Sequence, residues 1–345
     1  MCRLKRLGGI VLPLILILAG CGDAKPTEGV LVSHSATVVP PAVTLLFVGD
    51  IMLARTPGQA LARGDDPFAA FGPQLQQADL AVGNLECAVA TVGSRVPKLY
   101  NFRCHPRSVA PLAKYFGAVS VANNHAGDFG RGAFAEELDL LTKGGVPYFG
   151  GGHDAAEAHS ALIVERKGLK IGLLGYDEVE LRSYEAGRDT PGVAWSDDDQ
   201  VMADIAAVRA KVDLLVVYPH WGLEYHFQPS DRQRALSRKM IDAGADLVVG
   251  SHPHVTETAE YYKGRLIVYS LGNFVFDDFL DVGPSLKEPS RTSWVLRVTM
   301  DRTGLVTWDT LIARNDDSGF PRPVHGTAGP CGARESQAIG QCKTN

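Results

Sequence analysis

The stretch Leu247-Val248-Val249-Gly250-Ser251-His252-Pro253-His254 predicts a buried strand that runs into a loop with two histidines. A short run of leucine and β-branched valines is typical of strands that are covered on both faces. The run ends at a glycine, and the neutral imidazole that follows is a common metal ligand. Because a loop that leaves a buried strand is held rigidly, this stretch is a candidate metal-binding loop. Taken alone, the two histidines also fit a surface turn, so the assignment depends on the rest of the chain.

Length and composition are those of an ordinary globular protein. The chain has 345 residues, of which 45% are hydrophobic and 21% are charged. This is enough for one large domain or two smaller ones. The formal net charge is −5, and no basic block follows the first residues. A nucleic-acid partner is therefore not indicated.

The N-terminus has the features of a targeting segment. Three basic residues precede an almost wholly apolar run over residues 7–19, which is short for a membrane span and typical of a signal peptide. The sequence around Cys21 resembles a lipobox, whose cysteine is acylated. We therefore expect a lipoprotein signal peptide over residues 1–20 and a lipid-anchored, extracytoplasmic protein of the bacterial cell envelope. An uncleaved anchor is the alternative. Residues 21–42 are expected to form a flexible tether.

Cysteine usage fits an oxidising compartment. Besides Cys21 and a cysteine inside the expected signal peptide, the chain has Cys87, Cys104, Cys331 and Cys342, an even number in a compartment that permits disulfides. The simplest pairing is Cys87 with Cys104 and Cys331 with Cys342, because each bond then closes a short loop. The two other pairings remain open. A zinc cluster is less favoured, because no two of the four have the close spacing of zinc-ligand pairs.

Strand and helix patterns alternate along most of the chain and predict one α/β domain over residues 43–314. Strands are predicted at residues 43–48, 79–82, 118–121, 161–164, 170–175, 212–218 and 247–249. Helices are predicted at residues 66–77, 108–116, 131–143, 197–211 and 230–243. Later strands, expected to be antiparallel, are predicted at residues 256–262, 266–270, 294–299 and 305–312. Residues 315–345 are rich in Gly, Pro, Asp and Ser, which predicts a weakly ordered C-terminal tail.

Polar side chains follow the predicted strands at the points where the strands end. The seven potential metal-binding or acid/base groups at these points are Asp50, Glu86, Asn124, His125, His220, His252 and His254. In an α/β sheet the carboxyl ends of the strands share one edge, where ligand sites form. Each residue by itself is compatible with a cap or a turn, but together they predict a single site.

The residue types indicate the kind of metal. Imidazole combined with carboxylate and amide oxygen favours zinc, iron or manganese over calcium or magnesium. A carboxylate such as Glu86 can bridge two cations about 3.5–4 Å apart, the separation found in two-metal hydrolytic sites. One or two divalent cations (Zn, Mn or Fe) are therefore the expected cofactors.

Six short motifs occur between residues 44 and 280. In chain order they are Gly49-Asp50-Ile51-Met52-Leu53, Asn84-Leu85-Glu86, Ala122-Asn123-Asn124-His125, His220-Trp221-Gly222, Gly250-Ser251-His252-Pro253-His254 and Ser270-Leu271-Gly272-Asn273-Phe274. Together they resemble the signature of the CapA family of poly-γ-glutamate capsule-biosynthesis proteins. The resemblance implies a fold similar to that of calcineurin-like metallophosphoesterases. This fold is a single-domain, four-layer αββα sandwich with its site at the loop edge between two stacked sheets.

The resemblance also implies roles for the polar residues. The ligands of one cation would be Glu86, Asn124, His220 and His252. Those of the other would be Asp50, Glu86 and His254, with Asn84 as the weaker candidate for the bridging position. His125 matches the histidine that would protonate a leaving group. Met52 departs from the metallophosphoesterase pattern, which usually has histidine there. Because a thioether is a weak ligand for this chemistry, the Asp50 site is one ligand short.

Five further residues are expected near the same edge. Asp128 is a candidate catalytic residue, as is His125. The expected supports of the ligands, or contacts of the substrate, are Asn84, Asn123, Trp221 and Asn273. A turn role for Asp128 and Asn273, and core packing for Trp221, remain the alternatives.

Three functions are compatible with the sequence. The leading hypothesis is a metal-dependent hydrolase or transferase in capsule polymer synthesis, export or attachment. Its expected partners are the membrane, through the lipid anchor, an anionic polymer or a phosphorylated or γ-glutamyl substrate, and a capsule synthase membrane complex. The second hypothesis is a non-catalytic metal- or polymer-binding scaffold of that complex, which Met52 favours. An amidohydrolase-type barrel is the third, but its His-x-His pair would be expected at the first strand.

Overall fold

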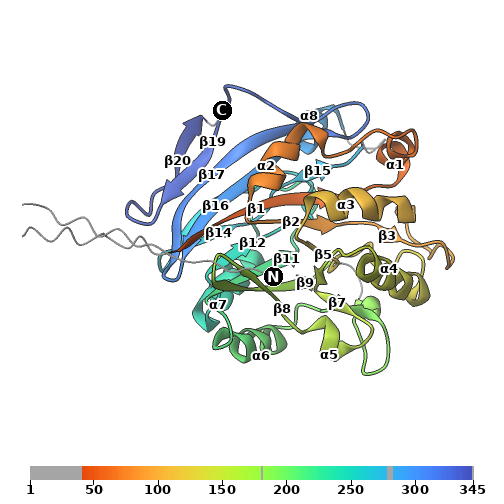
Figure 1. Cartoon of the computed structure of the whole chain (residues 1–345), viewed down its shortest axis with the longest axis horizontal. Helices are drawn as coiled ribbons and strands as arrows, with labels where there is room; N and C mark the ends of the chain where they lie inside the picture. Colours follow the sequence, from red (N-terminus) through yellow and green to blue (C-terminus); the bar gives the residue numbers. More distant parts are fainter. Residues whose placement is uncertain (1–40, 180–181, 278–282, 344–345) are drawn as a thin grey trace, which may run out of the picture. The chain divides into compact units, whose positions relative to one another are not determined.

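The structure is a computed structural model that describes residues 41–179, 182–277 and 283–343 (Figure 1). The expected signal peptide, Cys21 and nearly all of the expected tether lie outside the described residues. Among the described residues, no helix has both the length and the apolar character needed to cross a membrane.

The larger of two main sheets has ten strands. Eight of them follow the order β20-β19-β17-β16-β1-β2-β5-β6, while β15 pairs with β1 and β18 with β17. The strands are β1 (Ala42–Ile51), β2 (Leu80–Leu85), β5 (Ala118–Ser120), β6 (Tyr148–Phe149), β15 (Asn273–Val275), β16 (Thr292–Asp301), β17 (Gly304–Asn315), β18 (Pro321–Pro323), β19 (Ala328–Ala333) and β20 (Gly340–Lys343). Strands β1, β2, β5 and β6 run parallel, so their carboxyl ends meet at one edge.

The second sheet has six strands in the order β13-β14-β12-β11-β9-β8. They are β8 (Leu162–Arg166), β9 (Leu169–Asp177), β11 (Leu214–His220), β12 (Leu247–Val249), β13 (Ala259–Tyr262) and β14 (Arg265–Val268). The four inner strands are parallel, which places the ends of β11 and β12 side by side. Two short pairs complete the strands: β3 (Ala88–Val89) with β4 (Arg103–Cys104), and β7 (Gly151–Gly152) with β10 (Gly192–Val193).

Helices cover the outer face of each sheet (Figure 1). Those packed on the larger sheet include α1 (Arg55–Ala62), α2 (Gly72–Gln77), α3 (Val109–Tyr115) and α4 (Arg131–Lys143). The second sheet carries α5 (Ala155–Ala158), α6 (Asp198–Arg209) and α7 (Asp231–Ala243). The remaining helix, α8 (Pro284–Arg291), precedes β16, and three short 3-10 helices are η1 (Ala69–Phe71), η2 (Pro106–Ser108) and η3 (Arg182–Tyr184).

Side chains that point alternately to the two faces of each strand form three apolar layers. In β1, Leu46 packs in the helix-covered cluster, whereas Phe47 packs in the cluster that joins the two sheets. Val216 of β11 lies in that same inter-sheet cluster, because successive side chains of a strand point to opposite faces. Tyr218 also bridges the sheets, since its hydroxyl donates to the Val48 carbonyl at 2.7 Å. The predicted four-layer αββα sandwich is confirmed.

The expectation of a weakly ordered tail over residues 315–345 is wrong for the described residues. Strands β18 and β19 both pair with β17, and β20 pairs with β19. A disulfide between Cys331 and Cys342 joins β19 to β20. Composition misled the prediction because backbone pairing with an existing strand, together with a covalent bond, orders a segment that has few apolar side chains. The domain therefore extends beyond residue 314.

The predicted helix bounds are correct where residues in the sequence mark the ends of the helix, and they are wrong near proline. The predicted helix over residues 131–143 is α4, residue for residue. The predicted helix over 66–77 is instead the 3-10 helix η1 followed by α2. Pro73 explains the difference, because proline is tolerated in the first turn of α2, where Pro73 lies, but it would lie in the interior of a continuous helix over 66–77.

Helix α7 begins with a capping box that also holds a buried carboxyl group. The Ser230 side chain accepts from the Gln233 amide, and the Gln233 side chain accepts from the Ser230 amide. The Gln233 side chain also donates to Glu257 Oε2 at 2.7 Å. Burial raises the pKa of Glu257 to about 7, although the bond from Gln233 opposes the shift.

Stability is expected to depend on pH through Glu257. Between pH 4.5, its ordinary pKa, and about 7, the folded chain keeps a proton that the unfolded chain releases, so stability falls as pH rises. A Glu257→Gln variant has no carboxyl group to ionise and so does not lose stability in this way. It should exceed the parent's free energy of unfolding by about 2–3 kcal/mol at pH 8 and match it at pH 4. Denaturant unfolding between pH 4 and pH 8 measures the difference. If the free energy of unfolding changes with pH in the same way for both proteins, Glu257 is not the group responsible.

Candidate metal centre

The predicted ligands meet at the carboxyl ends of strands from both sheets. Asp50 lies in β1, Glu86 follows β2 and Asn124 follows β5, all in the larger sheet. His220 ends β11, and the two histidines of the opening stretch follow β12 in the second sheet. Asp50 pairs in register with Asn84 of β2 and Asn273 of β15, and His220 forms a bridge with Ser251. All seven groups predicted at this edge are buried.

Glu86 lies at the centre of this cluster. Its Oε1 atom is 3.8 Å from Nε2 of each of three imidazoles, those of His125, His220 and His254. This buried oxygen has no hydrogen-bond partner among the described residues. Burial, together with the nearby Asp50 carboxylate, raises the pKa of Glu86 well above its usual range. A buried acceptor without a partner is costly, so the arrangement calls for a cation.

The donor set fits a divalent cation. Two groups have ligand atoms within 4.8 Å of one another: Glu86 with His252 and His254, and Asp50 with Glu86 and His220. His252 Nδ1 is a second buried atom without a partner among the described residues. Burial, reinforced by neighbouring imidazoles, lowers the pKa of His220 and His252 well below the usual range. Both rings are therefore neutral at pH 7, the form that binds metal.

Glu86 belongs to both groups, as the resemblance implies for a bridging carboxylate. The groups otherwise differ from the division implied by the resemblance, because His254 groups with His252, and His220 with Asp50. Asn124 lies next to His220, as the resemblance implies, since its Oδ1 is 3.0 Å from His220 Nε2. Two ligands of one cation can have this separation, since each lies about 2 Å from the metal.

The loop of the opening stretch is held in a strained conformation. His252 and His254 have φ angles of 99° and 59°, a left-handed region that costs of order 1–3 kcal/mol per residue outside glycine. Gly250 has no room for a side chain, because an added Cβ would lie 2.1 Å from the Tyr269 carbonyl oxygen. Asp50 Oδ2 accepts from the His252 amide at 3.3 Å. Surrounding contacts thus fix where both imidazoles point.

Asparagines hold the ligands in place. Asn84 donates to Asp50 Oδ1 at 2.8 Å and accepts from Asn123 at 3.1 Å. Asn273 Oδ1 lies 2.8 Å from His254 Nδ1. The Asp50 carboxylate and Asn273 raise the pKa of His254, although burial opposes them. A metal-ligating imidazole commonly has such a partner for its other nitrogen.

Trp221 supports the loop from behind. It is fully buried in the apolar cluster under α6 and α7, and its indole donates to the Tyr269 carbonyl at 2.9 Å. An added Cβ on Gly250 would lie 2.4 Å from the indole nitrogen. Trp221 is thus a packing residue of the second sheet next to the histidine loop.

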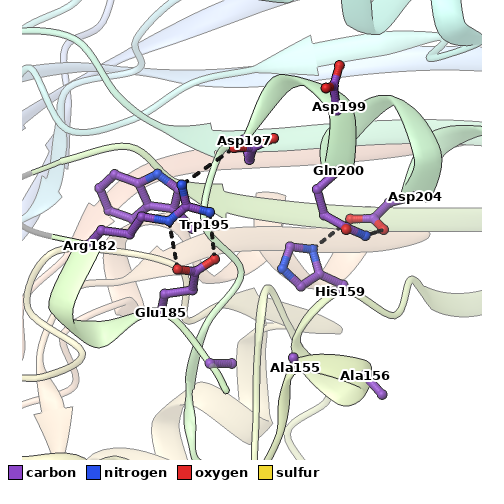
Figure 2. A pocket seen from close by; sticks show the side chains of 11 residues that line it. Ala155, Ala156, His159, Arg182, Glu185, Trp195, Asp197, Asp199, Gln200 and Asp204 are labelled. Atoms are coloured by element: carbon purple, nitrogen blue, oxygen red, sulfur yellow. Dashed lines mark hydrogen bonds and ion pairs between the residues drawn. The ribbon is translucent and has the colours of Figure 1, made fainter. Parts of the chain in front are cut away.

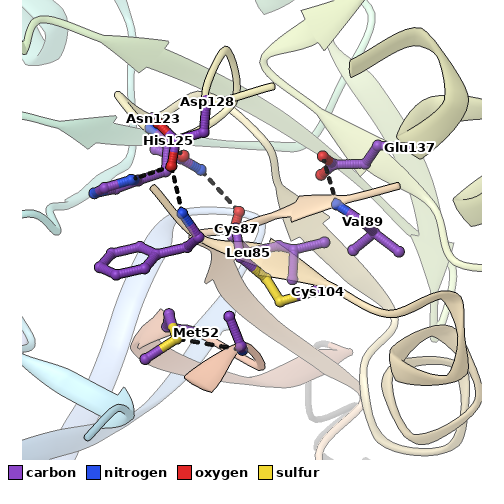
Figure 3. The surroundings of a disulfide bond; sticks show 11 residues. Met52, Leu85, Cys87, Val89, Cys104, Asn123, His125, Asp128 and Glu137 are labelled. Atoms are coloured by element: carbon purple, nitrogen blue, oxygen red, sulfur yellow. Dashed lines mark hydrogen bonds and ion pairs between the residues drawn. A yellow bond between two sulfur atoms is a disulfide. The ribbon is translucent and has the colours of Figure 1, made fainter. Parts of the chain in front are cut away.

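His125 and Asp128 form a buried pair with Nδ1 and Oδ2 separated by 2.7 Å (Figure 3). The Phe102 amide donates to the same Oδ2 at 2.6 Å, and Lys98 lies 3.2 Å from Oδ1. Lys98 also donates to the Asn124 carbonyl at 2.7 Å. Burial lowers the pKa of His125, while Asp128 partly offsets that effect. The carboxylate therefore orients an imidazole whose Nε2 faces Glu86.

The loop over residues 88–103 supplies these contacts. A disulfide between Cys87 and Cys104 closes it, and Cys87 directly follows Glu86 (Figure 3). Sequence reasoning found both disulfides, which are confirmed, but missed Lys98 and Phe102. The sequence did contain a signal for these two residues. Cys87 follows Glu86, so the loop that its disulfide closes must lie near the metal-binding cluster.

The sequence profile described as "Bacterial capsule synthesis protein PGA_cap" matches residues 44–278. This chain belongs to the PGA_cap family. The chain is 36% identical over 237 residues to "PGA biosynthesis protein CapA" of Bacillus subtilis (strain 168), covering 67% of this chain and 62% of that protein. It is 32% identical over 328 residues to "Capsule biosynthesis protein CapA" of Bacillus anthracis, covering 91% and 77%.

A solved structure supports the fold of this PGA_cap protein. A putative 5'-nucleotidase from Staphylococcus aureus superposes with a TM-score of 0.50 at 12% identity, over 78% of this chain and 53% of that one. At this identity the likeness concerns the fold alone. It agrees with the predicted four-layer fold.

Met52 of this PGA_cap protein is not aimed at the ligands. It is fully buried in the apolar cluster on the helix-covered face of the larger sheet. Its sulfur accepts from the Ala54 amide at 3.2 Å (Figure 3). The position where metallophosphoesterases usually have a histidine therefore adds no ligand here.

A cavity of about 770 Å³ lies elsewhere, and helices α5 and α6 contribute to its walls (Figure 2). It contains none of the predicted ligands. Its polar groups bind one another: His159 Nδ1 lies 2.7 Å from Asp204 Oδ2, and Arg182 pairs with Glu185 at 2.7 Å. The strand-end cluster, with its partnerless buried atoms, is the better candidate site.

Proposed function

We propose that this PGA_cap protein acts in the synthesis, export or attachment of poly-γ-glutamate capsule polymer through a metal-dependent hydrolase or transferase site. The observation that carries the proposal is Glu86 Oε1, a buried oxygen without a partner that faces three imidazoles at 3.8 Å. Family membership and the names of the two CapA relatives support the biological role.

The residues that would hold one or two cations are Asp50, Glu86, Asn124, His220, His252 and His254. When bound, a cation at this site polarises a phosphoryl or carbonyl oxygen and activates water. The chain's own contribution is a proton donor in a fixed position. Asp128 accepts from His125 Nδ1, which leaves Nε2 free to take a proton from the attacking water and then, as the imidazolium that Asp128 stabilises, to deliver it to the departing oxygen or nitrogen.

Location is part of the proposal. We infer that acylation of Cys21 anchors the chain at the bacterial cell envelope, facing the extracytoplasmic space, where it acts beside a capsule synthase membrane complex. Support comes from the lipobox-like sequence and from two disulfides, which persist in oxidising compartments. Fractionation of cells tests this, because a Cys21→Ser chain should leave the membrane fraction.

The second candidate function is a non-catalytic scaffold of the synthase complex that retains the fold and a cation. The specific observation in its favour is Met52, whose thioether is bound to the Ala54 amide and adds no ligand. Such a protein would bind metal and polymer without turnover.

One screen separates the two functions. The full-length chain in detergent is loaded with Zn²⁺, Mn²⁺ or Fe²⁺ and assayed on phosphomonoester, phosphodiester and γ-glutamyl substrates. The hydrolase proposal expects turnover that a chelator abolishes and the metal restores. Metal binding without turnover on any of the three classes would favour the scaffold.

A further inference from the structure

A cavity of about 510 Å³ adjoins the disulfide-closed loop. It is lined by three arginines, Arg55, Arg95 and Arg103, and by the aromatic residues Tyr100, Phe102 and Phe129. No acidic residue is among the described residues that line it, although the chain as a whole carries a formal charge of −5. A concave surface with positive charge alone attracts anions.

The cavity shares a wall with the candidate catalytic pair. The Phe102 ring lies 4.1 Å from the His125 imidazole, measured between ring centroids. The amide of the same residue donates to Asp128. A molecule in the cavity would therefore lie one aromatic ring away from His125.

Two of the arginines have neutral partners. Arg95 is exposed, and its Nε donates to the Asn101 side chain at 3.0 Å. Arg103 lies over the Phe129 ring at 3.9 Å and donates to the Val92 and Gly93 carbonyls. Within the described part of the chain, no carboxylate forms an ion pair with either side chain. The remaining arginine, Arg55, pairs with Asp277 at 3.3 Å.

Many other surface arginines do have carboxylate partners. Arg232, for example, binds Glu178 at 2.9 Å and Asp198 at 2.5 Å. Arg95 therefore keeps a charge that an external anion can neutralise, and Arg103, whose charge helps to lower the pKa of Glu136, adds to the positive potential of the cavity. Guanidinium groups match carboxylates particularly well, because the planar fork can donate two parallel hydrogen bonds.

We propose that this arginine-lined cavity is the docking site for a run of carboxylates on an anionic polymer. The inference rests on the proposed function, which supplies the polymer class, and adds where that polymer binds. Arg95 and Arg103 bind carboxylates of the chain, the aromatic walls contact its methylene groups, and Phe102 directs the next unit toward His125. The disulfide-closed loop thus forms both the support of Asp128 and the wall of the polymer site.

Binding of a γ-linked glutamate oligomer tests the proposal. The full-length chain in detergent, its Arg95→Glu variant and an Arg188→Glu control are titrated with labelled oligomer at low salt. Arg188 is exposed in a turn outside the cavity, so both variants change the net charge equally. We expect Arg95→Glu to weaken binding about tenfold, with a smaller effect at high salt. The control should bind like the parent.

The outcomes separate this inference from the proposed function. Equal affinities for the parent and a folded Arg95→Glu variant would overturn the docking site while leaving metal-dependent turnover untouched. A parent chain that hydrolyses small substrates but binds no oligomer would overturn the polymer role itself. Displacement of the oligomer by inorganic phosphate at the same anion concentration would make this a general anion site and refute the polycarboxylate assignment.

Discussion

A Glu86→Gln variant is expected to lose more than about 100-fold in affinity for Zn²⁺ or Mn²⁺, an effect above that of losing a residue that only supports a ligand. Glu86 belongs to both candidate ligand groups, so its replacement weakens every cation site that the cluster can form. Burial raises the pKa of its carboxyl group well above the usual range, which favours the uncharged form that glutamine imitates. The metal-free variant should therefore unfold at nearly the parent's temperature, while metal no longer raises that temperature.

Glu137 provides the matched control for this experiment. It is also a buried glutamate whose pKa burial raises well above the usual range. Its Oε2 accepts from the Val89 amide at 3.2 Å, away from the ligand cluster (Figure 3). Elemental analysis after dialysis and thermal unfolding with and without metal give the readouts. Parent-like metal affinity in Glu86→Gln, or an equal loss in Glu137→Gln, would refute the assignment of the bridging ligand.

A His125→Ala variant is expected to lower turnover on the best substrate by about 10²- to 10⁴-fold while keeping its metal content. The imidazole is the proposed proton donor, and it is not among the predicted ligands. Asp128→Asn should cost nearly as much, because it removes the carboxylate that accepts from His125 Nδ1 at 2.7 Å. The double variant should be little worse than either single one, since the two residues act as a unit.

The pair of His159 and Asp204 offers a control with the same geometry. Its Nδ1 and Oδ2 atoms are also 2.7 Å apart, but it lies in the separate cavity between α5 and α6 (Figure 2). His159→Ala should leave turnover unchanged. Metal loss in His125→Ala would make this residue a ligand, and an equal fall in both variants would show a structural effect. Unchanged capsule yield in cells that carry a folded His125→Ala chain would favour the scaffold.

Much of the fold follows from local pattern. The apolar run 247–249 is β12, and the helix over 131–143 is α4, as periodicity and the closing glycines predict. The strand-end positions of the ligands also follow from the sequence, because parallel strands present their carboxyl ends at one edge. The C-terminal strands could not be predicted in this way. They depend on pairing with β17 and on the disulfide between Cys331 and Cys342.

The sequence by itself determined the residue types of the site, the motif order that indicates the family, and the simplest disulfide pairing. Only the tertiary structure decided which ligands are neighbours, how Lys98 and Phe102 hold Asp128, and that Met52 faces the apolar core. The reason is physical. Periodicity records which face of a strand is buried, and that property is local. Contacts such as the one between Asp50 and the His252 amide, 202 residues apart in the chain, exist only once two sheets have packed against each other.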